Sequence, residues 1–180
     1  MKSYLKSFVA ISALSSLVAA PVILSAGEAS AETVIKNGTD ASYIGAGISA
    51  GVTNGGQAGT TKNFGGNLTG RFAIPNAPVS IRGDVMWSDD TSAIIPQASL
   101  DVPIAKRTNV YFTAGYSFVE KDGQPTPIGN KDGVVLGVGA ESEVAKDIII
   151  YGNTKVGLDN FTGTSAKPVS IQVGAGYSFK

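Results

Sequence analysis

The chain has 180 residues and carries 14 basic and 14 acidic side chains, which leave no net charge at pH 7. A chain without a basic surplus gives no reason to expect binding to nucleic acid. It contains no cysteine and no histidine, which excludes disulfides, thiolate metal sites and the most common general base. We therefore expect neither a metal nor a cofactor.

The first 31 residues are typical of an export signal. Two lysines precede an apolar stretch from Phe8 to Ala26, and Ala29-Ser30-Ala31 forms a small-residue cleavage motif. A single transmembrane anchor is the alternative, because about twenty apolar residues can span a bilayer; Pro21 and the cleavage motif favour export. The expected organisation is a signal peptide at 1–31, a periplasmic lead-in at 32–40 and one domain at 41–180.

Eight later segments show a two-residue alternation between apolar and polar or small side chains. The segment from Val110 to Phe118 is one of the clearest copies. Successive side chains of a strand point to opposite faces, so this pattern builds one apolar and one polar wall. The fourth segment is the weakest, since Pro96 and Pro103 both remove ladder donors. Strands are expected at about 41–52, 63–74, 78–88, 94–104, 109–119, 133–143, 147–158 and 168–179.

The connections between these segments alternate between long and short. Residues 53–62 and 120–132 form long loops, whereas 75–77 and 144–146 form short turns. Long loops at one end and short turns at the other are typical of an up-and-down barrel with an even number of strands. The pattern predicts an all-β, eight-stranded antiparallel transmembrane β-barrel with both termini in the periplasm.

Aromatic residues are expected to mark the two membrane interfaces of this barrel, because membrane barrels collect aromatic rings there. In the expected topology they sort into two girdles. Phe64, Trp87, Tyr116 and Phe118 fall near the outer rim, and Phe72, Phe112, Tyr177 and Phe179 fall near the inner rim.

The polar face of the strands carries charged side chains of both signs. A soluble ligand-binding barrel would instead place apolar residues on its inner wall. We expect the arginines to pair with the carboxylates, because an unpaired charge in a confined lumen is costly. The expected lumen charge cluster consists of Arg71, Arg82, Asp84, Asp101, Glu141 and Lys155.

The last strand ends on Val173-Gly174-Ala175-Gly176-Tyr177-Ser178-Phe179. From Ala41 onward the chain resembles the small eight-stranded outer-membrane barrels, the opacity-protein and OmpA/OmpX-like group. In that family such an ending is the assembly signal, here Val173, Ala175, Tyr177 and Phe179, although Lys180 follows the final aromatic. The resemblance implies a monomer in the outer membrane that contacts its lipids, the barrel-insertion machinery and periplasmic chaperones.

Function is less determined than architecture, because this family includes adhesins, structural anchors and passive pores. Enzymatic outer-membrane barrels rely on histidine, which is absent here, and Asp89-Asp90 is the one candidate calcium site. We expect a non-enzymatic barrel that is a narrow porin-like or structural protein with a largely plugged lumen. The alternatives are adhesion through the loops at 53–62, 120–132 and 159–167, and a soluble lipocalin-like carrier.

Overall fold

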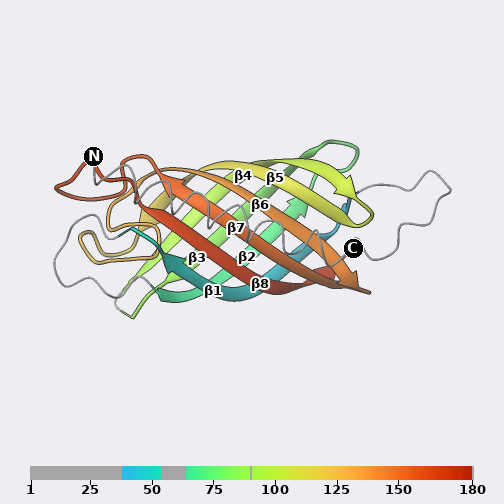
Figure 1. Ribbon diagram of the computed structural model, residues 1–180, viewed down its shortest axis with the longest axis horizontal. Helices are drawn as coiled ribbons and strands as arrows, with labels where there is room; N and C mark the ends of the chain where they lie inside the picture. Colours follow the sequence, from blue (N-terminus) through green and yellow to red (C-terminus); the bar gives the residue numbers. More distant parts are fainter. Residues whose placement is uncertain (1–37, 54–63, 90, 180) are drawn as a thin grey trace, which may run out of the picture.

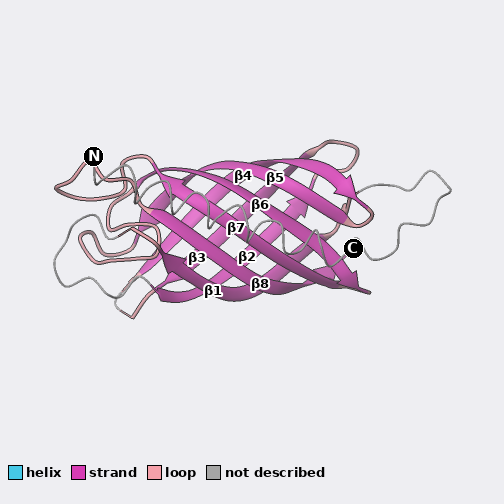
Figure 2. Ribbon diagram, viewed as in Figure 1, coloured by secondary structure: helices cyan, strands magenta, loops and turns pink. Residues whose placement is uncertain are grey.

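The computed structural model describes residues 38–53, 64–89 and 91–179. Several expectations concern residues outside these ranges: the signal peptide at 1–31, most of the lead-in, the loop around Gly56, Asp90 and Lys180. The described chain forms a closed barrel in which eight antiparallel strands follow one another in sequence order (Figure 1). Strands and loops account for all of the described secondary structure (Figure 2).

Each strand pairs with its neighbour in the sequence, and β8 pairs with β1 to close the barrel. All boundaries lie within two residues of those expected from the alternation, and the predicted fold class is confirmed. The strands are β1 Ser42–Gly51, β2 Phe64–Ala73, β3 Val79–Trp87, β4 Ser92–Ala105, β5 Thr108–Val119, β6 Gly133–Ala145, β7 Ile148–Gly157 and β8 Val169–Phe179.

The two prolines of β4 are accommodated within the strand. Pro96 pairs with Gly83 on β3, while the pairing with β5 is interrupted at 95–96 and resumes in the same register at Gln97. A proline cannot donate to the ladder, so the gap falls where a donor is missing. Pro103 lies where the β4–β5 register shifts, between 103 and 105.

The short turns share an unusual backbone conformation. Asn76, Arg107 and Asp147 each have φ of 60°, in the left-handed region that L-residues rarely adopt. The β4–β5 and β6–β7 registers shift just before their turns, as in hairpins that combine a turn with a bulge. These turns lie at one end of the barrel, and the described β5–β6 and β7–β8 loops lie at the other (Figure 1).

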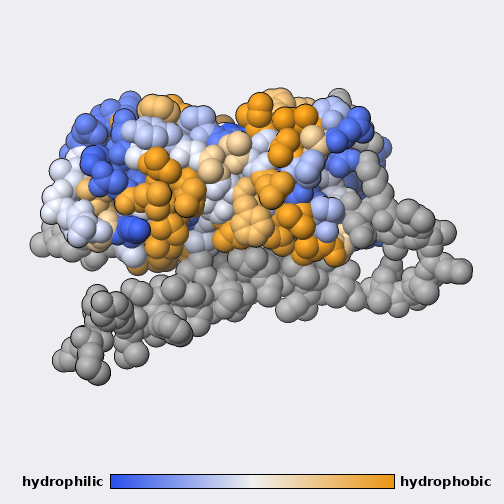
Figure 3. Space-filling view, turned by 90° about the horizontal axis from the view of Figure 1, so that it is seen from above, coloured by the Kyte–Doolittle hydropathy of each residue, from blue (hydrophilic) through white to orange (hydrophobic). Residues whose placement is uncertain are grey.

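The outer wall of the barrel is apolar. Phe64, Phe72 and Ile81 are about 60% exposed, at 62%, 59% and 60%. In Figure 3 apolar residues occupy the middle of the barrel's length and hydrophilic residues gather toward its two ends. An exposed apolar belt with a polar interior is the arrangement of a transmembrane barrel and the reverse of a soluble carrier, which excludes the lipocalin-like alternative. No helix long and apolar enough to cross a bilayer occurs in the described ranges.

Candidate functional site

The lumen is lined by the polar positions of the alternation. Along β3, Ser80, Arg82 and Asp84 face inward and are buried, while Ile81 and Gly83, which lie between them, are exposed. The same two-residue period places Arg71 of β2, Asp101 of β4 and Glu141 of β6 inside the barrel.

Four charged residues form one ion-paired group, which we call the lumen cluster: Arg71, Arg82, Asp101 and Glu141. Arg71 lies 3.1 Å from Asp101 and 2.9 Å from Glu141, and Arg82 lies 2.8 Å and 3.0 Å from the same carboxylates. All four are at most 6% exposed. Because β6 stands four strands from β2 in the closed barrel, the Arg71–Glu141 pair joins opposite walls. Arg82 reaches the same glutamate from β3, whereas Asp101 lies on β4, next to β3.

A second ion pair lies beside the lumen cluster. Lys155 Nζ is 2.8 Å from Asp84 Oδ2, and β7 and β3 are again opposite strands. Gln97 bonds to both partners: its Nε2 donates to Asp84 and its Oε1 accepts from Lys155, at 2.5 and 3.2 Å. Thr69 Oγ1 donates to Asp84 as well. Of the carboxylates expected to pair with the arginines, Asp84 therefore differs, because its partner is Lys155 of β7.

Tyrosine side chains fill the space around the lumen cluster. Tyr43 donates to Glu141 at 2.9 Å and accepts from Arg82 at 3.2 Å. The Arg82 guanidinium lies over the Tyr111 ring, 3.8 Å from its centroid, in a cation–π arrangement. Tyr43 also stacks on Tyr151, with the ring centroids 6.1 Å apart. Sequence analysis missed the role of Tyr43. A usable signal was that Tyr43 occupies one of the inward-facing positions in the alternation of β1.

Two inward glycines make room for these rings. A Cβ at Gly139 would lie 2.5 Å from Cζ of Tyr111, and a Cβ at Gly45 would lie 2.8 Å from Cε1 of Tyr151. Glycine is needed at these positions because a neighbouring ring lies where a side chain would begin.

The segment before β1 closes the turn end of the lumen. Thr39 is 5% exposed, and its carbonyl oxygen accepts hydrogen bonds from Arg71 at 3.1 Å and Asn109 at 2.8 Å. Gly38 forms a parallel bridge with Lys106. Part of the expected lead-in at 32–40 is thus built into the end of the barrel.

The loop end is closed by an apolar group, which we call the mouth cluster: Met86, Ala93, Ile95, Ile128 and Val135, all fully buried. Ile128 comes from the loop between β5 and β6, at the tip of a turn held by hydrogen bonds between Thr126 and Gly129. The turn is tied to its neighbours, since Ser88 Oγ donates to the Pro125 carbonyl oxygen at 2.6 Å. In the sequence, Ile128 follows Pro127 within an otherwise polar loop. Sequence analysis missed this signal.

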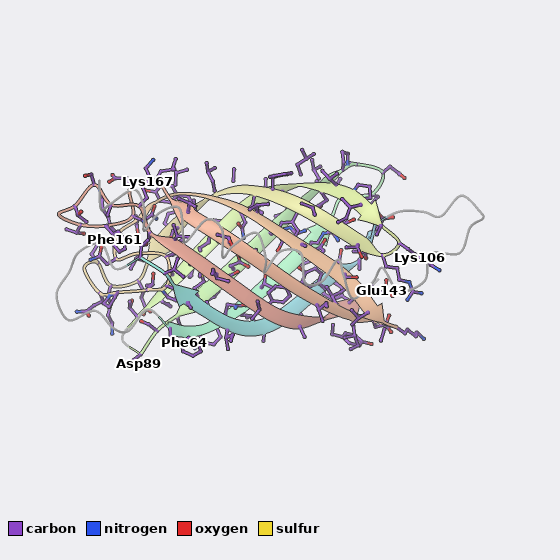
Figure 4. The ribbon with its side chains drawn as sticks, in the orientation of Figure 1. Phe64, Asp89, Lys106, Glu143, Phe161 and Lys167 are labelled. Atoms are coloured by element: carbon purple, nitrogen blue, oxygen red, sulfur yellow. The ribbon has the colours of Figure 1, made fainter. Side chains whose placement is uncertain are left out.

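The loop between β7 and β8 joins this cap. The Asn130 backbone nitrogen donates to the Asn160 carbonyl oxygen at 2.9 Å, and both residues are buried. Figure 4 shows Phe161 and Lys167 of this loop at the same end as Asp89, with Lys106 and Glu143 at the opposite end. Outside the barrel, Asp159 accepts a hydrogen bond from Lys131 at 2.8 Å, which raises the pKa of Lys131 above its usual value.

All eight aromatic residues expected in the girdles face outward, with exposed fractions from 40% to 62%. Phe64 begins β2 and Trp87 ends β3 at the loop end, whereas Phe179 ends β8 at the turn end. Phe72 contacts Phe179 edge to face across the β1 strand, with ring centroids 6.0 Å apart. Phe112 lies inside β5, paired with Val138 on β6, and so is farther from a strand end than the others.

Searches by sequence find no matching family model and no matching curated protein. Solved structures do match. The N-terminal β-barrel domain of Pseudomonas aeruginosa OprF gives a TM-score of 0.55 at 11% identity, covering 79% of this chain and 99% of that one. Ail, the attachment invasion locus protein of Yersinia pestis, gives 0.53 at 17% identity, covering 78% and 100%. The outer membrane protein OprG of Pseudomonas aeruginosa gives 0.52 at 10% identity, covering 81% and 99%.

At these identities the similarity concerns the fold alone. Together with the apolar wall and the polar, ion-paired interior, it defines the class of this protein, which is a small eight-stranded transmembrane β-barrel.

Proposed function

We propose that this protein is a non-enzymatic outer-membrane barrel whose lumen cluster holds it closed, so that it acts as a structural barrel or a very narrow porin-like pathway. The observation that carries the proposal is the ion pairing across the lumen, in which Arg71 of β2 and Arg82 of β3 both contact Glu141 of β6, while Asp101 of β4 contacts the same two arginines. An eight-stranded barrel is just wide enough for its own side chains to fill it. Side chains that bond across that width leave no passage for a large solute.

The charge balance of the interior supports an electrostatic plug. The lumen cluster has two cations and two carboxylates, and Lys155 neutralises Asp84. Buried charges are tolerated when they are paired and hydrogen-bonded. An ion entering this region would have to replace bonds that the protein already makes. The mouth cluster adds an apolar barrier at the loop end.

The last strand supports an outer-membrane location. The expected assembly signal of Val173, Ala175, Tyr177 and Phe179 forms the outward face of β8, which pairs with β1 in the seam that closes the barrel. In this proposal the signal peptide at 1–31 directs export. Periplasmic chaperones and the barrel-insertion machinery then deliver the chain to outer-membrane lipids, where it is a monomer.

The adhesion alternative gains little from the described loops. One Ail structure contains the heparin analogue sucrose octasulfate, but a polyanion needs a basic surface. Here residues 126–130 of the β5–β6 loop are buried, which leaves little of that loop exposed to a partner. The described β5–β6 and β7–β8 loops have no surplus of basic residues. Their charged residues are Lys121, Lys131 and Lys167 against Glu120, Asp122, Asp132 and Asp159.

Conductance across a planar bilayer tests the proposal. Refolded wild-type protein should conduct ions weakly, and Glu141→Gln should raise the conductance because both arginines lose a partner. Glu143→Gln is the matched control: it lies on the same strand but near the turn, 24% exposed and 4.0 Å from Arg107, and should leave conductance unchanged. A wild-type barrel that is stably open, or equal effects of the two variants, would contradict a plug formed by the lumen cluster.

A further inference from the structure

Part of the inner wall carries polar side-chain atoms that have no hydrogen-bond partner in the described part of the chain. Among the described residues, no hydrogen-bond partner exists for Thr113 Oγ1, Asn153 Oδ1, Ser170 Oγ or either end of the Gln172 amide. These side chains are at most 5% exposed. We call the four residues the polar band.

The members of the polar band are neighbours on adjacent strands. Asn153 of β7 is the register partner of Gln172 on β8, and Lys155 is the partner of Ser170. The unpartnered atoms of β7 and β8 therefore lie in two successive rows of the inner wall, and the second row includes Lys155, whose ammonium group pairs with Asp84 on β3.

Thr113 extends the polar band to β5. It pairs with Gly137, which in turn pairs with Lys155. A Cβ at Gly137 would lie 2.5 Å from Thr113 Oγ1 and 3.3 Å from Lys155 Cγ. The Thr113 hydroxyl and the Lys155 side chain thus converge over this glycine.

Gln172 shows why the polar band needs a ligand. A buried primary amide without hydrogen bonds is costly, and such groups in proteins are normally satisfied by protein or by ordered water. Gln97 of β4 follows this rule, since Asp84 and Lys155 bond to its two ends. Gln172 is at least as buried as Gln97, but neither end of its amide has a hydrogen bond.

The chemistry of the polar band selects a small neutral ligand. The unpartnered atoms include an amide donor, two amide oxygens and two hydroxyls, which act as donors or acceptors. None of these atoms is charged, and Lys155, which shares a row with Ser170, is already neutralised by Asp84, so the polar band offers no free charge to bind a cation or an anion. Water makes two to four hydrogen bonds of both kinds in buried polar sites.

We infer that the polar band is a binding site for ordered water on the inner wall formed by β5, β7 and β8. This goes beyond the proposed function, because it divides the lumen into a dry, ion-paired region and a hydrated one. The barrier to ion passage then resides in the lumen cluster and the mouth cluster, while the polar band between β5 and β8 is already solvated.

Nuclear magnetic resonance of the refolded full-length protein in lipid nanodiscs tests the inference. Cross-relaxation between water and the side-chain amide protons of Gln172 should report water with a long residence time at this site. Absence of any such contact at Gln172 would overturn the inference.

Stability variants give a second readout. Gln172→Met and Thr113→Val remove polar atoms that bind water in this account. The urea concentration at the midpoint of unfolding should therefore stay the same or fall. In a dry wall the same changes would remove unsatisfied groups and raise the midpoint, which would count against bound water. Gln97→Met is the matched control, since it removes a fully bonded buried amide and should lower the midpoint in either case. If the two readouts disagree, the direct contact between water and Gln172 decides.

Discussion

Arg82 and Glu141 meet across the lumen in a two-pronged hydrogen bond. Nη1 of Arg82 donates to Oε2 of Glu141 at 3.0 Å, and Nη2 donates to Oε1 at 3.1 Å. Paired forks of this kind are among the strongest polar contacts in proteins. The arginine comes from β3 and the glutamate from β6, so this contact connects strands that are not neighbours in the barrel.

Removing one partner of this pair should destabilise the barrel more than removing both. Arg82→Gln leaves two buried carboxylates with a single arginine, and breaking a buried pair costs about 3–5 kcal/mol. Adding Glu141→Gln should restore part of that loss, with a coupling energy of about 1–3 kcal/mol. Reversible unfolding in lipid vesicles measures each step of the cycle.

Asp84 provides the control for this cycle. It lies on the same strand as Arg82 but pairs with Lys155, so Asp84→Asn should show less coupling to Arg82→Gln than Glu141→Gln does. Equal coupling for the two carboxylates would mean that the interior responds to net charge and not to specific pairs.

A charge placed on the outer wall should also be costly. Val173 faces outward on β8 with 37% exposure, and a lysine at such a site near the bilayer midplane costs about 2–4 kcal/mol. Ala166→Lys in the exposed β7–β8 loop is the control and should be close to neutral. If unfolding in lipid shows the same stability for both variants, Val173 does not face hydrocarbon.

Ser99 faces inward on β4 but is bonded within the lumen cluster. It accepts from Arg82 Nε at 2.9 Å and donates to Asp101 at 3.0 Å. A charge there would disrupt the lumen cluster, which makes Ser99 unsuitable as a tolerant site.

The orientation of the barrel in the membrane can be tested with introduced cysteines, since the chain has none of its own. Cysteines in the long loops, at Gly56 and Gln124 and near Gly163, should be labelled in intact cells, whereas cysteines near Asn76 and at Ala145 should not. Gly163 and Asn76 have positive φ values, so Ser165 and Ala77 are better positions for the substitutions. Labelling at the short turns instead would reverse the predicted topology.

The β4–β5 turn should be improved by glycine. Arg107 has φ of 60°, a conformation that costs an L-residue about 1–2 kcal/mol and glycine very little. We expect Arg107→Gly to increase the free energy of unfolding by about 0.5–1 kcal/mol. Lys106→Gly, at the adjacent turn position without positive φ, should give no gain.

The Lys131–Asp159 pair should be visible in a pH titration. The Asp159 carboxylate raises the pKa of Lys131, so any stabilisation by this pair is present below the lysine's unfolded pKa and is lost as the pH rises through its folded pKa. Asp159→Asn should return the Lys131 side chain to ordinary lysine titration, measured by nuclear magnetic resonance. An unchanged titration would show that the pair does not persist in solution.

Much of the fold follows from the alternation of polar and apolar residues along the chain. This alternation predicts where the strands lie and which of their side chains face the lumen. That reasoning placed Arg71, Arg82 and Glu141 inside the barrel. It could not assign Asp84 to Lys155, since pairing across the lumen depends on how far each strand is staggered along the barrel axis. The position of Ile128 was equally inaccessible, because a loop residue finds its place only through contacts with β3, β4 and β6.

The cross-lumen ion pairs also constrain how the barrel can assemble. Arg71, Arg82, Asp84 and Asp101 come from the first half of the barrel, while Glu141 and Lys155 come from the second. Until the two halves meet, Glu141 lacks both of its arginines, and Asp84 and Lys155 lack each other. A partly inserted chain would therefore hold these charged groups without their native partners in a medium of low polarity, which favours concerted closure over a long-lived open sheet.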